Sequence, residues 1–437
     1  MIHSTAAILS IGDELAIGQS LDTNSRWIAE RLTSRGITVC EHATIGDRLD
    51  DHARALRRLA GEVDLIVSSG GLGPTADDLT REALAAAMGE PLEEDAAALG
   101  GIRRLLEARG RTMTDLQRLQ ARRPRSGRCL ENANGTAPGL AATVRLGGRA
   151  CDVFCLPGPP DEMKPMFARF VEPSLRPAPG RVVKTRVLHT LGLAESEVAR
   201  RLGPLMERTR NPLVGTTASG GVVSVRIRYE GASAGADQAM QAAESGCREV
   251  LGPVVFGAEA ETMATVVLGL LRERGERLVV AESCTGGGLG AMFTETPGSS
   301  DALLGGWITY SNAMKTAGLG VPRDLLEAHG AVSEPVARAM ALGALERAPA
   351  PGAQHALAIT GIAGPDGGTE AKPVGTVFIG RATRRGAQRD PECEVRRFSI
   401  PGGREAVRER SALLALGMLR LALIEAEGQR LLWETGR

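Results

Sequence analysis

This sequence has no excess of either charge and few aromatic residues. Its 52 Lys and Arg residues balance 52 Asp and Glu residues, and Phe, Trp and Tyr make up 3% of the chain. A dedicated nucleic-acid or membrane-surface protein normally carries an excess of positive charge, or a basic and aromatic stripe, that attracts its partner. We therefore expect neither nucleic acid nor a membrane as partner, and small molecules as ligands.

Cysteine pairs are also missing. The seven cysteines are scattered, odd in number and without any C-x-x-C spacing, which argues against a disulfide framework and a zinc site. His329 and His355 lack the H-x-H or H-E-x-x-H spacing of zinc hydrolases, so each is expected to pack or hydrogen-bond locally. This pattern fits a reducing cytoplasm and favours covalent over zinc-dependent catalysis.

Long apolar runs are absent. No stretch approaches the roughly 18 apolar residues that cross a bilayer, and the first residues, MIHSTAAILSIGDEL, lack the basic region and cleavage site of a signal peptide. No short repeat or heptad pattern is present. A cytoplasmic globular protein is expected, and 437 residues are enough for two or three domains.

The first 172 residues alternate between strand and helix patterns. Strands are predicted at AAILSIG, TVCEHATIG and DLIVSSGG, with helices that begin near Asp22 and Asp50. This alternation is typical of a parallel sheet covered by helices. We therefore predict an α/β domain over residues 1–172, which ends at the proline-rich stretch VEPSLRPAPGR.

Two further units follow along the chain. Residues 181–257 show a strand (VVKTRVLHTLG), a helix, a loop, a strand (VVSVRIRYEG) and a helix, which predicts a small α+β domain. Residues 259–430 contain RLVVAES, GGWITYS, HALAITG and GTVFIGRAT as strand candidates between helices. The predicted fold class is α/β, with two three-layer α/β domains joined by a small α+β middle domain.

The C-terminal domain carries a serine at a place suited to chemistry. Ser283 in VVAESCTGGG follows a strand and directly precedes a glycine-rich helix start, where free backbone N–H groups and the helix dipole favour negative charge. An oxyanion or a phosphate would be stabilised there. The competing interpretation is a serine helix N-cap, and the neighbouring Cys284 is expected to be a small buried hydrophobe.

A serine nucleophile needs a base that removes its proton. The stretch GGWITYSNAMK places Tyr310 and Lys315 after the next strand candidate, and a partly desolvated lysine can act as base at neutral pH. The glycine-rich turn TGIAGPDGG, with Lys372 and Thr376, is suited to cradling a phosphate. For each of these glycine-rich turns alone, a plain tight turn without a bound ligand explains the sequence as well as a binding site does.

The stretches AESCTGG, GSS, YSNAMK, HGAVSEP and TGIAGPDGG with KPVGTV occur in the order found in the CinA C-terminal amidohydrolase (PncC) family, which residues 259–426 resemble. The resemblance implies deamidation of nicotinamide mononucleotide to nicotinate mononucleotide and ammonia without a cofactor. It implies Ser283 as nucleophile, Lys315 as general base and Tyr310 as support for the pair. The implied substrate contacts are Thr285, Gly286, Gly287, Ser299, Ser300, Asn312, Thr360, Gly361, Gly364, Lys372 and Arg404. Gly403 stands where the family usually has the Asp of a G-D-R triplet.

The edge of the predicted N-terminal sheet collects glycines and carboxylates. Asp13 and Asp47 follow strand candidates, and SGGLGPTADDLT joins a glycine turn to Asp77 and Asp78, which suits a phosphate and a divalent cation. NGTAPG and LPGPPDEM add further turns, for which simple loop chemistry is the competing interpretation. Asp77 is alternatively a helix cap.

Residues 5–170 resemble the molybdopterin-binding fold of MogA-like and MoeA-like proteins and, more closely, the CinA N-terminal domain. The resemblance implies ADP-ribose pyrophosphatase activity, with a divalent metal ion that neutralises the diphosphate and orients water. Asp78 is the first expected ligand, followed by Asp77, Asp13 and Asp47. The implied substrate contacts are Gly70, Gly71, Gly73, Thr75, Asn134, Gly135, Pro157 and Gly158.

Three functional hypotheses follow from the sequence. The first is a bifunctional enzyme that acts on nicotinamide mononucleotide and ADP-ribose. The second confines catalysis to Ser283 and makes the N-terminal domain a pterin- or nucleotide-binding module. The third is a partner protein in DNA uptake or repair, against which the balanced charge argues. A homodimer is the expected assembly, because a small domain between two α/β domains suits one.

Overall fold

The computed structural model describes residues 1–349, 352–385 and 390–435. The chain forms two compact units, of which the first comprises Met1–Lys184 with Tyr229–Ala239 and the second Thr185–Arg228 with Met240–Arg437. None of the described helices has the length and apolar character needed to span a membrane.

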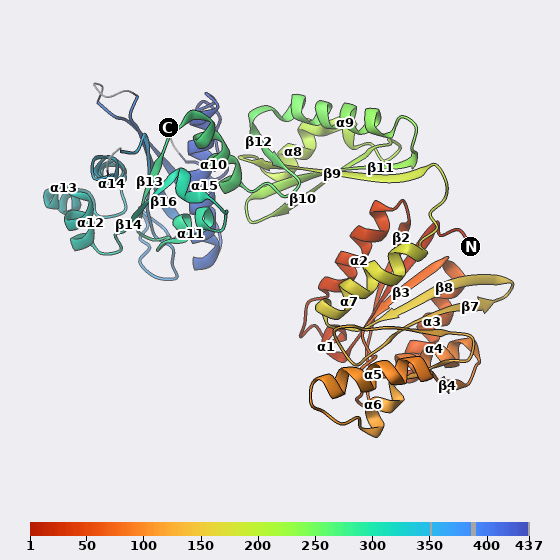
Figure 1. Cartoon of the computed structure of the whole chain (residues 1–437). Helices are drawn as coiled ribbons and strands as arrows, with labels where there is room; N and C mark the ends of the chain where they lie inside the picture. The colour runs from red at the N-terminus through yellow and green to blue at the C-terminus, as the bar shows by residue number, and fades with distance from the viewer. Residues whose placement is uncertain (350–351, 386–389, 436–437) are drawn as a thin grey trace. The chain divides into compact units, whose positions relative to one another are not determined.

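A six-stranded sheet forms the centre of the first unit (Figure 1). The strand order is β2-β1-β3-β8-β7-β6; the first four strands are parallel, while β7 and β6 run antiparallel to their neighbours. The bounds are β1 Thr5–Ile11, β2 Thr38–Ile45, β3 Leu65–Ser69, β6 Arg128–Leu130, β7 Gly139–Leu146 and β8 Arg149–Leu156.

Helices cover both faces of this sheet. On one face, α2 (Thr23–Ser34) and α7 (Pro160–Met166) pack Ile28, Leu32 and Met163 against the strands. On the other face lie α3 (Leu49–Glu62) and α4 (Thr80–Met88). The three-layer α/β arrangement predicted for this part of the chain is therefore confirmed.

A small lobe interrupts the first unit between α4 and β6 (Figure 1). Ile102 and Leu106 of its helix α5 form a separate core with Ala121. The lobe consists of β4 Leu92–Glu94, α5 Ala96–Ala108, α6 Asp115–Leu119 and β5 Arg122–Pro124, and β4 pairs with β5. The remaining short helices of this part are α1 Asp13–Ala16, η1 Phe167–Val171 and η2 Glu172–Ser174.

The middle of the chain forms a four-stranded sheet in the order β10-β11-β9-β12 with helices beside it. The loop predicted before VVSVRIRYEG is wrong: residues 213–219 form β10, which pairs with β11 through a two-residue Gly220-Gly221 turn. Adjacent glycines between two strands favour such a hairpin. The bounds are β9 Arg181–Leu191, α8 Glu195–Leu202, η3 Gly203–Met206, β10 Leu213–Ser219, β11 Val222–Ala232, α9 Ala236–Leu251, η4 Gly252–Val254 and β12 Val255–Ala258.

The C-terminal part contains a five-stranded sheet in the order β14-β13-β15-β16-β17. The strands β13 Leu278–Glu282, β14 Leu303–Ile308 and β15 His355–Gly361 are parallel, whereas β16 Thr376–Thr383 and β17 Glu392–Ser399 are antiparallel. Strand β17 was not predicted from the sequence. Because β13, β14 and β15 are parallel, the residues that follow them meet at one edge of the sheet.

Helices again form a layer on each face. Leu268, Leu271 and Leu419 pack on one face from α10 (Met263–Arg274) and α15 (Arg404–Leu423), together with α11 (Gly288–Thr294). The other face is covered by α12 Asn312–Leu319, α13 Arg323–His329 and α14 Glu334–Glu346, and η5 (Ser299–Asp301) precedes β14. The predicted fold class is confirmed here as well.

Candidate functional site

Ser283 is the first residue after β13, and its backbone is held by the neighbouring strand. Its N–H donates to the carbonyl of Ile359 on β15 at 3.0 Å, so the strand pairing continues one residue beyond β13. The side chain is 7% exposed. Helix α11 begins at Gly288 with Gly287 as its N-cap, so the interpretation of Ser283 as a helix N-cap is wrong.

The amine of Lys315 lies against this serine. Lys315 is on α12, the helix that follows β14. Its Nζ lies 3.0 Å from Ser283 Oγ and donates to the Thr309 carbonyl at 2.9 Å. Glu282 of β13 pairs with Ile308 of β14, so the next residues, Ser283 and Thr309, lie at the same level. The bond to the Thr309 carbonyl therefore holds the lysine amine beside the serine.

Burial affects the pKa of Lys315. The side chain is 1% exposed, and this desolvation lowers the pKa of its ammonium group. Within the part of the chain that the structure describes, its hydrogen-bond partners are the Ser283 hydroxyl and the Thr309 carbonyl, neither of which is charged. An uncharged amine in contact with a serine hydroxyl can accept its proton.

Glu282 occupies backbone N–H groups that the sequence analysis expected to be free. Its buried carboxylate accepts hydrogen bonds from Gly287 and Leu289 at 3.0 Å each and from Gly290 at 2.8 Å. These three donors are therefore not free to bind an oxyanion or a phosphate, because a carboxylate of the chain already satisfies them. The same carboxylate holds the turn that carries Ser283.

Tyr310 makes no hydrogen bond to the serine or the lysine among the described residues. It is 60% exposed, and its hydroxyl accepts a hydrogen bond from Arg404 at 2.9 Å. The preceding residue, Thr309, is fully buried, because successive side chains of an extended segment point in opposite directions. The contact of Lys315 with Thr309 was not predicted, because it is made by the backbone carbonyl of Thr309, which every residue type carries.

Arg404, the first residue of α15, reaches toward the same edge. Besides Tyr310, its guanidinium contacts the Gly364 carbonyl at 2.7 Å. The N-cap of the helix, Gly403, has φ −76°, and a Cβ there would have no heavy atom within 4 Å. The backbone therefore does not require glycine at this position, and Arg404 is oriented without the aspartate expected there.

The turn after Ser283 depends on glycine and on a second arginine. Gly286 and Gly287 have φ values of +60° and +97°, which glycine adopts readily. The buried Thr285 accepts hydrogen bonds at its carbonyl from Arg408 at 2.9 and 3.3 Å. Arg408 was not foreseen, although it follows Arg404 by four residues and therefore lies on the same face of α15.

The glycine-rich turn after β15 is tied to neighbouring loops. The Thr360 hydroxyl donates to the Ala331 carbonyl at 2.8 Å, and the Lys372 ammonium donates to the His329 carbonyl at 3.0 Å. A Cβ at Gly361 would lie 2.7 Å from a side chain of β16, which explains the glycine. Lys372, expected at a phosphate, thus already has a main-chain partner.

Ser299 and Ser300 lie away from the nucleophile. They precede β14, and the first residue of β14 pairs with the first residue of β13. Ser283 follows the last residue of β13, so it lies at the other end of that strand. The separation along the strand is about 16 Å at roughly 3.3 Å per residue. The expectation that both serines share a substrate with Ser283 is wrong within one chain. Asn312, in contrast, opens α12 and is exposed.

Cys284 and His355 are held locally, whereas His329 is exposed. Burial raises the pKa of the Cys284 thiol to about 12, so this side chain remains protonated, as expected for a buried hydrophobe. His355 is buried and bonded to Glu276 at 2.9 Å, at the start of β15 and therefore at the far edge of the sheet.

The expected N-terminal site forms a hollow of about 390 Å³ at the carboxyl ends of β1, β3 and β8. Eight expected residues line it, namely Gly70, Gly71, Gly73, Asp47, Asp77, Asp78, Pro157 and Gly158. Glu14, next to Asp13, and Thr136 and Glu162, from the stretches NGTAPG and LPGPPDEM, also line it, together with Gln120, which was not predicted. None of the described lining residues carries a positive charge.

Close contacts build the glycine turn of this hollow. A Cβ at Gly70 would lie 2.1 Å from the Ile11 carbonyl, and its φ is +109°. Behind the turn, the buried Arg81 donates to the carbonyls of Leu72 and Gly73 at 2.7 and 2.8 Å. Arg81 fixes the turn and was missed by the sequence analysis.

The four expected metal ligands have different partners. The Asp13 and Asp47 carboxylates each accept from the other residue's N–H, at 3.0 and 2.9 Å. Burial raises the pKa of Asp47, and the nearby charges of Asp13 and Asp77 add to this effect. Asp78, the first expected ligand, instead accepts from the N–H of Thr75 at 2.9 Å and from its hydroxyl.

Within residues 1–349, 352–385 and 390–435, no three His, Cys, Asp or Glu side chains gather closely enough to hold a metal ion. The residues therefore do not form a ready metal site around Asp78. One or two carboxylates are enough to bind a Mg²⁺ ion only when its other ligands are water molecules and the phosphate oxygens of the substrate.

Other expected residues near this hollow serve the surrounding loops. The N–H groups of Asn134 and Gly135 both donate to Asn132 Oδ1 at 3.0 Å, which is the simple loop chemistry considered as the alternative. Asp77 is not a helix cap, because the N-cap of α4 is Leu79, so that alternative interpretation is wrong.

Three family models match consecutive parts of the chain. They are "CinA C-terminal domain" at residues 260–423, "Probable molybdopterin binding domain" at residues 7–177 and "Damage-inducible protein CinA KH domain" at residues 185–257. KH domains clamp nucleic-acid backbones with a G-x-x-G loop, and residues 185–257 contain no such spacing.

Proteins similar over the whole length are also known. A CinA-like protein of Prochlorococcus marinus (strain MIT 9313) is 41% identical and the match covers 96% of each chain. A CinA-like protein of Anaeromyxobacter sp. (strain Fw109-5) is 41% identical over 95% of this chain and 98% of its own. The crystal structure of the protein CinA from Thermoplasma acidophilum is 35% identical, covering 39% of this chain and 98% of that chain with a TM-score of 0.36. The chain belongs to the CinA family.

Proposed function

We propose that the C-terminal domain is a nicotinamide mononucleotide deamidase. The observation that carries this proposal is the 3.0 Å contact between Ser283 Oγ and Lys315 Nζ in a buried setting without a carboxylate partner for the lysine among the described residues. A buried amine that is not held in its charged form is suited to activate a serine at neutral pH.

The proposed reaction has two halves. Lys315 takes the proton of the Ser283 hydroxyl while Oγ attacks the amide carbon, and the lysine then returns the proton to the departing nitrogen, which leaves as ammonia. An acyl-enzyme ester remains on Ser283. Water, deprotonated by Lys315, attacks this ester; Oγ recovers the proton, and nicotinate mononucleotide is released.

The surroundings support a small phosphorylated substrate. Arg404 brings a cation to the edge where Ser283 lies, and its contacts, Tyr310 and Gly364, are uncharged. Since Glu282 already satisfies the N–H groups at the start of α11, we assign the phosphate to Arg404 rather than to that helix. The half-exposed Tyr310 and Ile308 offer apolar surface for the nicotinamide ring.

The direct test is to incubate the purified full-length chain with nicotinamide mononucleotide and to follow ammonia and nicotinate mononucleotide by mass spectrometry. Formation of both products in equal amounts is expected, with and without a metal chelator, because the proposed steps use only Ser283, Lys315 and water. A lack of either product would contradict the proposal.

A second candidate function belongs to the N-terminal hollow, which we propose hydrolyses ADP-ribose. Supporting this are a glycine turn at the carboxyl end of the sheet and a carboxylate-rich lining without positive charge. A diphosphate can enter such a hollow only with its charge neutralised, so we expect the substrate to be its Mg²⁺ complex. Release of AMP from ADP-ribose that stops on chelation supports this function. Binding without release would instead support a non-catalytic nucleotide- or pterin-binding module.

A further inference from the structure

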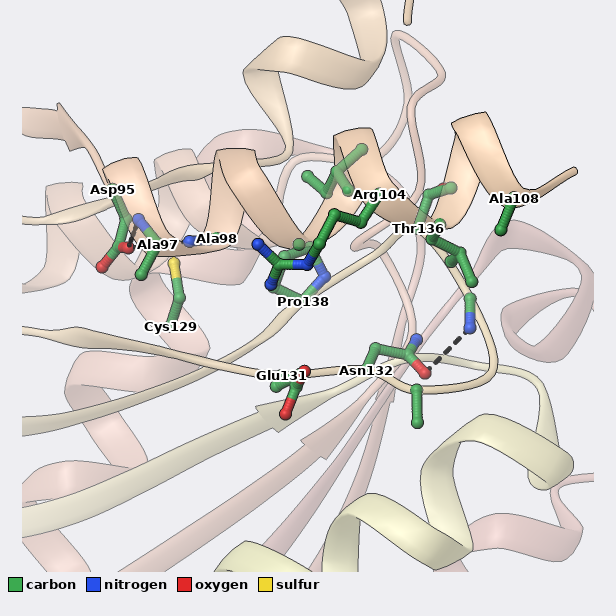
Figure 2. A pocket seen from close by; sticks show the side chains of 15 residues that line it. Asp95, Ala97, Ala98, Arg104, Ala108, Cys129, Glu131, Asn132, Thr136 and Pro138 are labelled. Carbon is green, nitrogen blue, oxygen red and sulfur yellow. Dashed lines mark hydrogen bonds between the residues drawn. The ribbon is translucent and has the colours of Figure 1, made fainter. Parts of the chain in front are cut away.

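A second hollow adjoins the N-terminal one and has no role in the functions proposed so far. It measures about 580 Å³ and lies between α5 and the segment formed by β6 and the loop after it (Figure 2). Thr136 lines both hollows, so the two adjoin.

The wall contributed by α5 consists mostly of small or apolar residues. Gly101 lies in the middle of this wall, and the nearest atom to a Cβ there would be Arg104 Nη2 at 3.9 Å. Glycine weakens a helix interior relative to alanine, and here no close packing requires it. The other small or apolar lining residues of the helix are Ala97, Ala98, Ile102, Leu105 and Ala108.

One cation extends into this compartment. Figure 2 shows the Arg104 side chain lying across the hollow, and its guanidinium has no hydrogen-bond or ion-pair partner in the described part of the chain. The carboxylates of the lining are paired elsewhere, Asp95 with Arg123 at 3.1 Å and Glu131 with Arg169 at 2.9 Å. A free guanidinium stacks on aromatic rings and donates to their acceptor atoms.

A buried acceptor in the adjoining hollow also lacks a partner. Gln120 is 1% exposed; its Nε2 donates to the Leu72 carbonyl at 3.2 Å, while its Oε1 has no hydrogen-bond partner among the described residues. An unpaired buried acceptor costs stability unless a ligand supplies a donor. The hydroxyl groups of a sugar are suitable donors.

We propose that the hollow beside α5 is the base-binding compartment of the N-terminal site. It takes the planar heteroaromatic base of a nucleoside diphosphate, which lies against Gly101 and under Arg104. The diphosphate then lies over the glycine turn at residues 70–73, and a sugar hydroxyl reaches Gln120. This inference rests on the nucleotide specificity of the second proposed function.

The test compares two leucine substitutions in α5. Gly101→Leu fills the compartment, whereas Ala96→Leu introduces the same side chain at an exposed residue of the helix that does not line it. Binding of AMP and of ribose 5-phosphate to the full-length chain is measured by titration calorimetry with Mg²⁺ present. Gly101→Leu should raise the Kd for AMP at least about ten-fold and leave that for ribose 5-phosphate unchanged. Ala96→Leu should match the wild type for both.

Arg104→Ala, which removes no hydrogen bond or ion pair within the described chain, provides an independent variant if Gly101→Leu fails to fold. It should raise the Kd for AMP several-fold and leave ribose 5-phosphate binding intact. Unchanged AMP affinity in Gly101→Leu and Arg104→Ala would overturn the inference. Failure of the wild type to release AMP from ADP-ribose would contradict the proposed hydrolysis alone, because AMP binding is measured separately.

Discussion

The Nζ of Lys315 lies 3.0 Å from the Oγ of Ser283, although 32 residues separate the two in the chain. The lysine is more deeply buried than the serine, and its second partner is a backbone carbonyl. Desolvation therefore opposes its charge while the geometry keeps it in contact with the hydroxyl. The predictions below follow from this pair and from the residues that hold it.

Replacing Lys315 with arginine should abolish most deamidation. The guanidinium retains a positive charge at all accessible pH values and cannot accept the serine proton. Loss of a general base reduces turnover by about 10²–10⁴-fold. The rate of ammonia release at saturating nicotinamide mononucleotide measures the effect, with Lys372→Arg as the control, because Lys372 binds a backbone carbonyl. Equal rates for wild type and Lys315→Arg would rule out Lys315 as the base.

The pH dependence should report the lowered pKa of Lys315. Only the neutral amine can take a proton, so kcat/KM should rise with pH through the pKa of the free enzyme and then level off. Because burial lowers this pKa, the midpoint should lie below the ordinary lysine value of 10.5. A pH profile of initial rates tests this, and a rate that falls as pH rises through this range would contradict the assigned role.

Glu282 should be important for both stability and turnover. Glu282→Ala leaves three N–H groups at the start of α11 without their acceptor, which should destabilise the protein by about 2–3 kcal/mol. Thermal denaturation measures the loss, and the deamidase rate should fall because the turn holding Ser283 is freed. Glu295→Ala, at the exposed far end of the same helix, should change neither quantity. Wild-type stability of Glu282→Ala would refute the capping role.

Gly403→Asp should stabilise the protein slightly. The residue is the N-cap of α15 with a backbone that any residue adopts, and space for a side chain is available. An aspartate there can accept from the first-turn N–H groups, which is worth about 0.3–1 kcal/mol. Thermal or urea denaturation of the two proteins tests this. A clear decrease in stability would show that the glycine is required after all.

Much of the fold followed from strand and helix periodicity. The parallel strands and the helix layers around them were predictable, because a buried parallel strand has a short run of apolar residues in the sequence, with a helical pattern on either side. The same reasoning placed Ser283 and Lys315 after neighbouring strands, whose pairing brings them together. The strand β10 was missed because its polar, glycine-containing sequence resembles a loop until the pairing with β11 is known.

Other features depend on three-dimensional contacts that local sequence does not show. A carboxylate that caps the helix after its own strand, as Glu282 does, looks like an ordinary charged residue in the sequence. Ser299 and Ser300 were assigned to the same sheet edge as Ser283, although they precede a strand and Ser283 follows one. In parallel strands, the residues before and after a strand lie at opposite edges of the sheet. The unpaired Arg104 became visible only with the hollow around it.

The most direct test of the central claim compares three proteins in one assay: the wild type, Ser283→Ala and Ser300→Ala. Each is incubated with nicotinamide mononucleotide, and nicotinate mononucleotide and ammonia are measured by mass spectrometry. We predict that wild type and Ser300→Ala form both products at similar rates, while Ser283→Ala forms none above background. Equal product formation by Ser283→Ala would contradict the assignment of Ser283 as the nucleophile.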